Sequence, residues 1–428
     1  MPTRSLTPPR GPIAVTVTPP GSKSLTNRAA IVAALADGPA LLTGVLDSID
    51  TQVMRQSLDQ LGLVTEFDPA ARTLLIEGVG TPFPNDSLTL DLHNSGTSLR
   101  FLTAACAIAG GRYTLSGNPR MRERPIADLV DALAPIVDGS LAASATGCPP
   151  VTIDSHGSGG GTTRVRGAIS SQYLSALLMA APRAAADVTI EIEGELVSRP
   201  YVEMTLAVMR AFEAEVEEPS PGRFVVRSKP YVLKRTTYEI EPDASAASYW
   251  MAAGALAGEV TVSRLDRDSL QGDIAFADVL GQMGAVVEWK PGAVTVRKPD
   301  SPLRGIDVDM GPISDTAQTA AVVAMFADGP TTIRGVGHMR HKETDRVAAL
   351  VAEIGRLGLQ ADEHADGLTI HPGVPVPKEP VQTYDDHRMA MSFALAGLMT
   401  HGIEIDDPGC VGKTYPTFWE HWSEHVEG

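Results

Sequence analysis

Short segments rich in Val, Ile, Leu and Thr recur at nearly constant spacing, and this is the most regular feature of the chain's hydrophobic pattern. The intervals between them are 73, 75, 72, 71 and 72 residues. The segments are centred on Leu42, Leu115, Ile190, Val262, Ile333 and Ile405. Regular spacing of this kind is typical of a repeated supersecondary unit. We therefore predict six copies of one βαβαββ unit.

Amphipathic helices are expected after the first five of these segments, because apolar residues return there every three or four positions. The predicted helices are 51–61, 126–133, 202–212, 274–283 and 344–357. Hairpin strands follow in most copies, with turns at Pro221-Gly222, Pro291-Gly292 and Asp366-Gly367. Most copies thus contain a hairpin.

Ala-rich helices precede the β segments and are apolar almost all round, so we predict that they are buried. They cover 24–35, 95–109, 171–181, 244–256, 316–327 and 387–399. Their openings are rich in Ser, Thr, Asp and Asn, the preferred N-cap residues. Capping does not explain Lys23, Arg28, Arg100 or Arg388 near these openings. A charged side chain beside a buried helix needs a partner.

The length of 428 residues exceeds what one hydrophobic core usually holds, so we expect two domains of roughly 200 residues each. The net charge of -17 argues against nucleic acid as a partner, since nucleic-acid binding relies on clustered Lys and Arg. Three widely spaced cysteines match neither a disulfide framework nor a zinc motif, which favours a reducing compartment. No apolar run reaches the roughly 18 residues of a membrane span. We expect a cytoplasmic protein.

The segment Pro20–Arg28 predicts an anion site at the start of a helix. Small residues lead into a first turn that carries Lys23 and Ser24, with Arg28 one turn later. Unpaired N–H groups and the helix dipole favour a phosphate there. The segment is not a P-loop, because Gly21 has no preceding glycine at the Walker spacing.

Further cations gather in four later segments. Arg120, Arg122 and Arg124 stand before a predicted helix. Lys342 and Arg346 lie four residues apart at the start of another, where a like-charge pair costs stability unless an anion bridges it. The other two segments are Asp385–Arg388 and Gly412–Thr414.

So many cations in a chain of net charge -17 indicate an electropositive cleft for a small, highly anionic substrate. Asp315 and Glu343 are candidate acid and base groups beside them. For each segment alone, a solvated charged loop or a surface salt bridge remains the alternative. Neither a Ser-His-Asp order nor metal-ligand spacing is evident, and no metal is expected.

Together these motifs resemble those of the 5-enolpyruvylshikimate-3-phosphate synthases, an enolpyruvyl transferase family. The resemblance covers nearly the whole chain in the family's order and spacing. It rests on 20–28, 94–100, 119–125, 170–172, 198–201, 314–315, 342–346, 386–391 and Lys413.

The resemblance implies an α/β fold, a two-domain inside-out α/β barrel with six βαβαββ repeats, three per domain. One domain is expected at 22–241 and the other from 1–21 plus 242–428, with the active site in the cleft between them. The implied reaction, in the shikimate pathway of aromatic amino-acid biosynthesis, transfers the enolpyruvyl group of phosphoenolpyruvate to the 5-hydroxyl of shikimate 3-phosphate. Phosphate leaves through a tetrahedral intermediate. A monomer without cofactor, nucleic acid or membrane partner is expected.

Motif matching assigns catalysis to Lys23, Asp315, Lys342 and Glu343. Asp315 is expected to accept the proton of the attacking hydroxyl, Glu343 to protonate the methylene carbon, and the lysines to stabilise developing charge. The expected phosphoenolpyruvate contacts are Lys23, Gly96, Arg124, Gln172, Lys342, Arg346, Arg388 and Lys413. The expected shikimate 3-phosphate contacts are Lys23, Ser24, Arg28, Ser170, Ser171, Gln172, Ser198, Tyr201, Asp315, His338 and Lys342.

Two positions depart from the family pattern. His338 stands where many members have Asn, and Phe101 stands where Pro is common. Gly96 is of the glyphosate-sensitive type, so sensitivity is expected, although Phe101 puts the shape of that pocket in question.

Three other functions compete with this interpretation. A UDP-N-acetylglucosamine enolpyruvyl transferase would carry a Cys in the loop 117–121, where this chain has none. A non-catalytic phosphometabolite-binding protein would not need Asp315 and Glu343 beside its cations. A kinase-like phosphoryl transferase is disfavoured by the missing Walker spacing.

Overall fold

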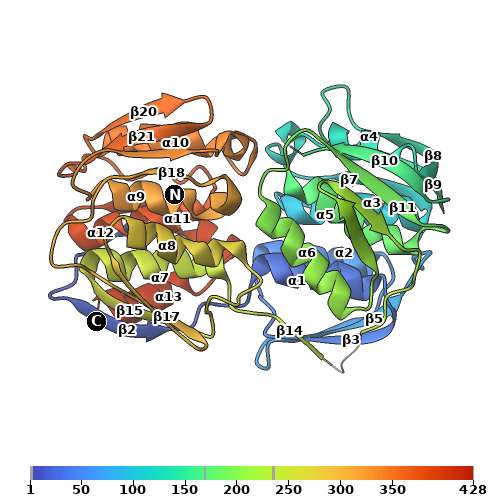
Figure 1. Ribbon diagram of the computed structural model, residues 1–428, viewed down its shortest axis with the longest axis horizontal. Coiled ribbons are helices and arrows are strands. Elements are labelled where there is room, and N and C mark those ends of the chain that lie inside the picture. The colour runs from blue at the N-terminus through green and yellow to red at the C-terminus, as the bar shows by residue number, and fades with distance from the viewer. Residues whose placement is uncertain (1–2, 168–169, 234–236, 428) are drawn as a thin grey trace. The chain divides into compact units, whose positions relative to one another are not determined.

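In the computed structural model, which describes residues 3–167, 170–233 and 237–427, the chain forms two compact units. We refer to Gly21–Ile240 as the contiguous unit. Met1–Pro20 and Glu241–Gly428 together form the second, which we refer to as the split unit. Both units are built from sheets and helices, and the predicted α/β fold class is confirmed (Figure 1).

One undivided copy of the repeat runs from β6 to β9 in the contiguous unit. β6 (Ser87–Asp91) and β7 (Gly111–Ser116) are parallel neighbours, joined through α3 (Gly96–Ala109). β9 (Val151–Ser158) pairs antiparallel with β7 and with β8 (Val137–Ala142). A parallel pair needs a long crossover, which α3 supplies, whereas the antiparallel β8 and β9 follow each other directly in the chain.

The same strand order recurs in the other four-stranded sheets of the described residues, β10-β11-β13-β12, β14-β3-β5-β4, β2-β15-β17-β16 and β18-β19-β21-β20. The remaining strands of the contiguous unit are β3 (Asp37–Thr43), β4 (Thr65–Asp68), β5 (Thr73–Val79), β10 (Gly161–Arg166), β11 (Val188–Glu193), β12 (Val216–Ser220), β13 (Arg223–Val226) and β14 (Thr237–Glu239). Its remaining helices are α1 (Lys23–Ala34), α2 (Ile49–Gln60), α4 (Ala127–Leu133), α5 (Ser171–Ala180) and α6 (Arg199–Ala211).

The split unit has shorter strands and more irregular helices. Its strands are β1 (Thr3–Ser5), β2 (Ile13–Val17), β15 (Gly258–Ser263), β16 (Val286–Lys290), β17 (Ala293–Arg297), β18 (Asp307–Asp309), β19 (Thr331–Arg334), β20 (Gln360–His364), β21 (Gly367–His371) and β22 (Glu404–Asp406). Its α-helices are α7 (Ala244–Ala257), α8 (Phe276–Gln282), α9 (Ala317–Ala324), α10 (Arg346–Arg356), α11 (His387–Ala394), α12 (Ala396–Met399) and α13 (Phe418–Trp422).

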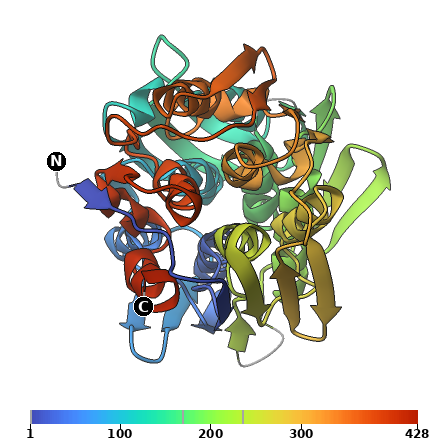
Figure 2. The ribbon, with the colours of Figure 1, turned by 90° about the vertical axis from the view of Figure 1, so that its left-hand side faces the viewer.

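The Ala-rich helices form the core of each unit, as their uniform hydrophobicity predicts. α1, α3 and α5 pack on one another in the contiguous unit, and nearly every residue in them is buried. In the split unit α9 packs between α7 and α11, whose residues are buried as well. Figure 2 shows helices of the split unit nearly end-on, with strands around them. Among the described residues, no helix combines the length and apolar character needed to cross a membrane.

In each unit, a parallel pair joins strands that lie far apart in the sequence. β2, which precedes the contiguous unit, pairs in parallel with β15 of the split unit. β14, at the end of the contiguous unit, closes that unit's sheet by pairing in parallel with β3. The two passages of the chain lie side by side, because Asp243 N–H donates to Pro20 O at 2.8 Å. At Gly21 a Cβ would stand 2.0 Å from the carbonyl oxygen of Gly44, so this passage requires glycine.

The sixth sheet is reduced in size. β22 pairs antiparallel with the N-terminal strand β1, and Ile405 of β22 forms a parallel bridge with Val381. The N-terminal strand therefore takes the place that a hairpin strand occupies in the other copies.

Two of the predicted long helices differ from the prediction. The one predicted at 316–327 is the shorter helix α9, which follows directly after the 3₁₀ helix η4 (Gly311–Thr316). The one predicted at 387–399 divides into α11 and α12 at Leu395, whose N–H bonds three residues back to Ser392 O. Such i→i−3 bonds tighten a helix locally.

Candidate active-site clusters

Charged side chains gather in the split unit where its helices begin. The carboxylate of Asp386 caps α11 by accepting the Arg388 N–H at 2.9 Å. Asp345 caps α10 in the same way, accepting the Ala348 N–H at 3.0 Å. Helix N-termini attract carboxylates because their N–H groups lack internal partners. Local capping thus fixes the start of both helices that carry the predicted arginines.

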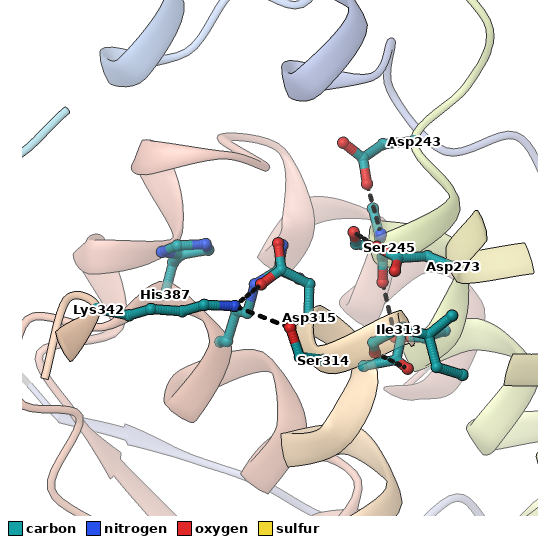
Figure 3. A network of polar contacts seen from close by, with 12 residues as sticks. Asp243, Ser245, Asp273, Ile313, Ser314, Asp315, Lys342 and His387 are labelled. Carbon is teal, nitrogen blue, oxygen red and sulfur yellow. Dashed lines mark hydrogen bonds and ion pairs between the residues drawn. The ribbon is translucent and has the colours of Figure 1, made fainter. Parts of the chain in front are cut away.

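Asp315, at the end of η4, contacts three cations. Its Oδ1 lies 2.6 Å from Lys342 Nζ and 3.4 Å from Arg346 Nη1. Its Oδ2 lies 2.7 Å from Arg388 Nη2. Figure 3 shows Lys342 reaching across to Asp315 and Ser314. Three predicted cations therefore converge on the predicted base.

Arg346 is the most buried of these cations, with 1% of its side chain exposed. It donates to both oxygens of Asp386, at 2.7 and 3.2 Å, and to Glu343 at 3.0 Å. Burial works against the charged guanidinium, but the carboxylates of Asp386, Glu343 and Asp315 outweigh it and raise the pKa of Arg346 above its ordinary value. Glu343 also accepts from Lys413 at 3.0 Å. This network of four cations and three carboxylates is referred to below as the acid-paired cluster.

The predicted like-charge pair of Lys342 and Arg346 on one helix is wrong. α10 begins at Arg346, and Lys342 follows the 3₁₀ helix η5 (Gly337–His341) with non-helical backbone angles. Both side chains meet at Asp315 instead. A carboxylate of the chain itself thus takes the position that the sequence suggested for a bound anion.

The side chains of His338 and Lys342 both contact the hydroxyl of Ser314. Lys342 donates to Ser314 Oγ at 3.2 Å, and Ser314 Oγ lies 3.0 Å from His338 Nε2. Burial and the charge of Lys342 lower the pKa of His338 to about 3, so its ring is neutral at physiological pH. The Ser314 hydroxyl accepts from Lys342, and its own proton is thereby available to His338 Nε2. Burial, only partly offset by Asp315, lowers the pKa of Lys342 below its ordinary 10.5.

The contiguous unit carries a second cluster, which begins at Arg28 of α1. Arg28 is buried and donates to Thr205 Oγ1 at 2.8 Å, to Ser24 O at 3.0 Å and to Tyr201 O at 3.3 Å. Its guanidinium lies 5.3 Å from the ring centroid of Phe101. The unusual Phe101 therefore supports a residue assigned to shikimate 3-phosphate.

Gly96, Arg100 and Arg124 form the next part of this cluster. Arg124 donates to Asn94 O and Asn94 Oδ1, both at 3.3 Å, and is buried. Arg100 donates to Gly96 O and Pro125 O, both at 3.1 Å. A Cβ on Gly96 would stand 2.4 Å from Arg124 Nη2. The absence of a side chain at Gly96 leaves room for the Arg124 guanidinium.

The remaining predicted residues of the contiguous unit open α5 and α6. Ser170 caps α5 by accepting the Gln172 N–H at 3.2 Å, and Gln172 Nε2 donates to Thr97 Oγ1 at 3.3 Å. Ser171 is the first residue of α5, and Ser198 precedes α6 with a left-handed φ of 57°. Tyr201 lies in the first turn of α6, and Lys23 and Ser24 open α1. We refer to these residues with Arg28, Arg100 and Arg124 as the carbonyl-held cluster.

The arginine-rich loop predicted at 120–124 is divided by burial. Arg124 is buried, whereas Arg122 is exposed and Arg120 pairs with Glu123 at 3.0 Å. Arg124 joins the cluster through Asn94.

Some residues of both clusters were not predicted from the sequence. Asp386 is fully buried against Arg346, and Tyr249 Oη accepts from Arg388 at 3.4 Å. Asn94 and Thr205 hold Arg124 and Arg28. Asp386 had a signal, since it is an acidic residue directly before a buried helix. Thr205 had none, because it lies inside an ordinary amphipathic helix.

Both clusters suit a small, multiply charged anion, since they offer guanidinium, ammonium and hydroxyl donors at helix starts. Within residues 3–167, 170–233 and 237–427, no group of three His, Cys, Asp or Glu side chains is arranged to hold a metal ion.

Comparison with known proteins gives a consistent result. The family described as EPSP synthase (3-phosphoshikimate 1-carboxyvinyltransferase) matches residues 8–422. A 3-phosphoshikimate 1-carboxyvinyltransferase of Marinomonas sp. is 43% identical over 94% of this chain and 94% of its own. The chloroplastic enzyme of that name from Petunia hybrida is 46% identical over 96% of this chain and 84% of its own.

Solved structures agree in fold. EPSP synthase from Acinetobacter baumannii superposes with a TM-score of 0.79 at 24% identity, covering 99% of this chain and 98% of that one. The enolpyruvyl transferase NikO from Streptomyces tendae gives a TM-score of 0.78 at 19% identity, covering 99% and 97%. At these identities the likeness establishes the fold alone.

Proposed function

Because the chain belongs to the EPSP synthase (3-phosphoshikimate 1-carboxyvinyltransferase) family, we propose that its two clusters bind and activate that family's two substrates. The chain is a transferase of the shikimate pathway, and its reaction moves the enolpyruvyl group of phosphoenolpyruvate to the 5-hydroxyl of shikimate 3-phosphate. The observation that carries the proposed roles is the contact of Asp315 with three cations.

We assign phosphoenolpyruvate mainly to the acid-paired cluster. Its phosphate and carboxylate compete with the carboxylates of the chain for guanidinium and ammonium donors, which form strong charge-assisted bonds to such groups. The assigned residues are Lys342, Arg346, Arg388 and Lys413, together with Lys23, Gly96, Arg124 and Gln172 of the contiguous unit. The close approach of Arg124 to Gly96 supports the assignments of these two residues.

We assign shikimate 3-phosphate mainly to the carbonyl-held cluster. Ser24, Arg28, Ser170, Ser171, Gln172, Ser198 and Tyr201 bring hydroxyl, amide and guanidinium groups to the starts of α1, α5 and α6, which pack together. Lys23, Asp315, His338 and Lys342 complete the assignment. Helix starts are well suited to a phosphate group.

The oxygen of the 5-hydroxyl attacks C2 of phosphoenolpyruvate, and Asp315 accepts the proton of that hydroxyl. Glu343 protonates the methylene carbon, which gives the tetrahedral intermediate, and loss of that proton with departure of phosphate restores the double bond. Lys23 and Lys342 stabilise the charge that develops. Substrate anions that draw Lys342, Arg346 and Arg388 away from Asp315 leave its carboxylate available as a base.

The active site in a cleft between the units remains a prediction. We also propose a monomer in the cytoplasm, and the buried, unpaired state of Cys106, Cys148 and Cys410 is consistent with a reducing compartment. Glyphosate is proposed to compete with phosphoenolpyruvate beside Gly96, which an inhibition titration against phosphoenolpyruvate checks.

The decisive experiment measures phosphate release from phosphoenolpyruvate by the purified protein. Release is expected with shikimate 3-phosphate and absent without it. Release with UDP-N-acetylglucosamine instead would overturn the assignment of the second substrate. Binding of both compounds without any release would favour a non-catalytic role.

A further inference from the structure

Glu353 is a completely buried carboxylate that none of the assigned roles uses. It lies on α10, seven residues after Arg346, which places it two turns and about 10 Å further along the same face of the helix. A buried charge is costly unless hydrogen bonds and opposite charges compensate it. The partners of Glu353 therefore indicate what it does.

Two of its partners belong to the segment that leads into α11. Oε2 accepts the Gln382 N–H at 2.9 Å, and Oε1 accepts the Tyr384 hydroxyl at 2.6 Å. Burial and the bond to Glu353 raise the pKa of Tyr384 to about 12, so its hydroxyl remains a donor at physiological pH. The third partner is Arg356 Nε, at 3.3 Å. α10 is thus bonded directly to residues 382–384.

The segment it binds has an unfavourable backbone conformation. Tyr384 and Asp385 have φ values of 56° and 54°, two consecutive left-handed residues that are not glycine. This conformation is sterically unfavourable for a residue with a Cβ, so the surrounding contacts must maintain it. Directly after it come Asp386, which binds Arg346, and Arg388, which reaches Asp315.

We propose that Glu353 is a positioning residue for the transferase reaction: it holds the strained turn 382–385 and thereby sets where Arg388 points. α10 then contacts the N-cap of α11 through Arg346, and the segment before that N-cap through Glu353. The inference rests on the proposed function, which gives Arg388 a contact with phosphoenolpyruvate. A displacement of about 1 Å in such a group is enough to cost catalytic efficiency.

The test separates positioning from simple stabilisation by its substrate dependence. Glu353→Leu fills the same buried space without an acceptor, and we expect the KM for phosphoenolpyruvate to rise about tenfold while the KM for shikimate 3-phosphate stays constant. Glu353→Gln retains an acceptor for the Gln382 N–H, and its amide donates to the Tyr384 oxygen. We expect it to remain within about threefold of the parent.

Tyr384→Phe removes one hydroxyl at a site 42% exposed, so it tests the proposal even where Glu353→Leu fails to fold. It is expected to raise the KM for phosphoenolpyruvate about threefold. Glu379→Gln is the matched control, because Glu379 also pairs with Arg356, at 2.9 Å, and is exposed. Its kinetics are expected to match the parent.

An unchanged KM for phosphoenolpyruvate in folded Glu353→Leu and in Tyr384→Phe overturns the positioning role, even where thermal stability falls. Arg388→Lys distinguishes this failure from failure of the proposed function. If Arg388→Lys still raises the KM for phosphoenolpyruvate, only the proposed role of Glu353 is wrong. If Arg388→Lys has no effect, the assigned phosphoenolpyruvate site itself is wrong.

Discussion

The two clusters hold buried arginines in opposite ways. Arg346 of the acid-paired cluster contacts three carboxylates, those of Asp315, Glu343 and Asp386. Arg100 of the carbonyl-held cluster is also buried, but it donates to the neutral oxygens of Gly96 and Pro125. The three carboxylates of the acid-paired cluster offset most of the charge of its four cations, whereas the oxygens that Gly96 and Pro125 offer to Arg100 fix the side chain without offsetting its charge.

This difference matches the two tasks of the site. Carboxylates that share cations with a substrate become available when the substrate arrives, which suits proton transfer. Carbonyl and hydroxyl partners do not compete with an anion for charge, which suits tight binding of a phosphate. The acid-paired cluster is therefore expected to perform chemistry and the carbonyl-held cluster to provide affinity.

The largest expected effect is on stability. Arg346→Gln leaves the buried Asp386 and Glu343 short of their main cation and should lower the free energy of unfolding by about 3–5 kcal/mol. Arg100→Gln leaves only neutral oxygens and should cost about 1–2 kcal/mol. Urea unfolding of both variants measures the contrast. Equal losses would show that the kind of partner does not matter.

Asp315→Asn tests the division between chemistry and affinity. Loss of the base should lower kcat about a hundredfold or more. Phosphoenolpyruvate should bind no more weakly than in the parent, because three cations lose a competing negative charge. Phosphate-release kinetics and calorimetric binding give the two values. Near-normal turnover would remove Asp315 from its role.

Gly96→Ala should act through Arg124. The added Cβ would lie 2.4 Å from Arg124 Nη2 and 2.7 Å from Arg100 Nη1, so these groups have to move. We expect the KM for phosphoenolpyruvate to rise about tenfold. Gly355→Ala on α10 is the control, since its Cβ meets nothing within 4 Å. If both variants bind phosphoenolpyruvate normally, Arg124 does not contact it.

Ser314→Ala is expected to have the smallest effect, on pH dependence. Lys342 acts as an ammonium ion, and its lowered pKa means that activity is lost as pH rises through a value below 10.5. Ser314 Oγ accepts from that ammonium ion, so its removal should shift the alkaline limb of kcat/KM to lower pH by about half a unit to one unit. Thr97→Val, which removes the contact to Gln172 in the other cluster, should leave the alkaline limb of kcat/KM at the same pH.

The sequence predicts the fold class and repeat well because both follow from periodicity. The buried character of α1, α3 and α7 follows from their Ala-rich, largely apolar sequences. The break at Leu395 was not predictable in this way, because the surrounding residues favour helix.

The sequence predicted which residues belong to the two clusters better than it predicted how they are arranged. Motifs supplied Lys342 and Arg346, but a helix assumed to begin too early placed them one turn apart on one surface. Glu353 gave no signal, because a single Glu in an amphipathic helix usually faces water. Only packing against the segment 382–384 gives it a role.

The pairing of the N-terminal strands of the split unit with strands late in the sequence has a consequence for synthesis on the ribosome. The contiguous unit has all of its strands once Glu239 has emerged. β2 can pair only after β15 has been synthesised, and β1 only after its partner strand, where Thr3 pairs with Asp406, has been synthesised. The contiguous unit is thus expected to fold first during translation, while the N-terminal segment stays unpaired until nearly the whole chain has been made.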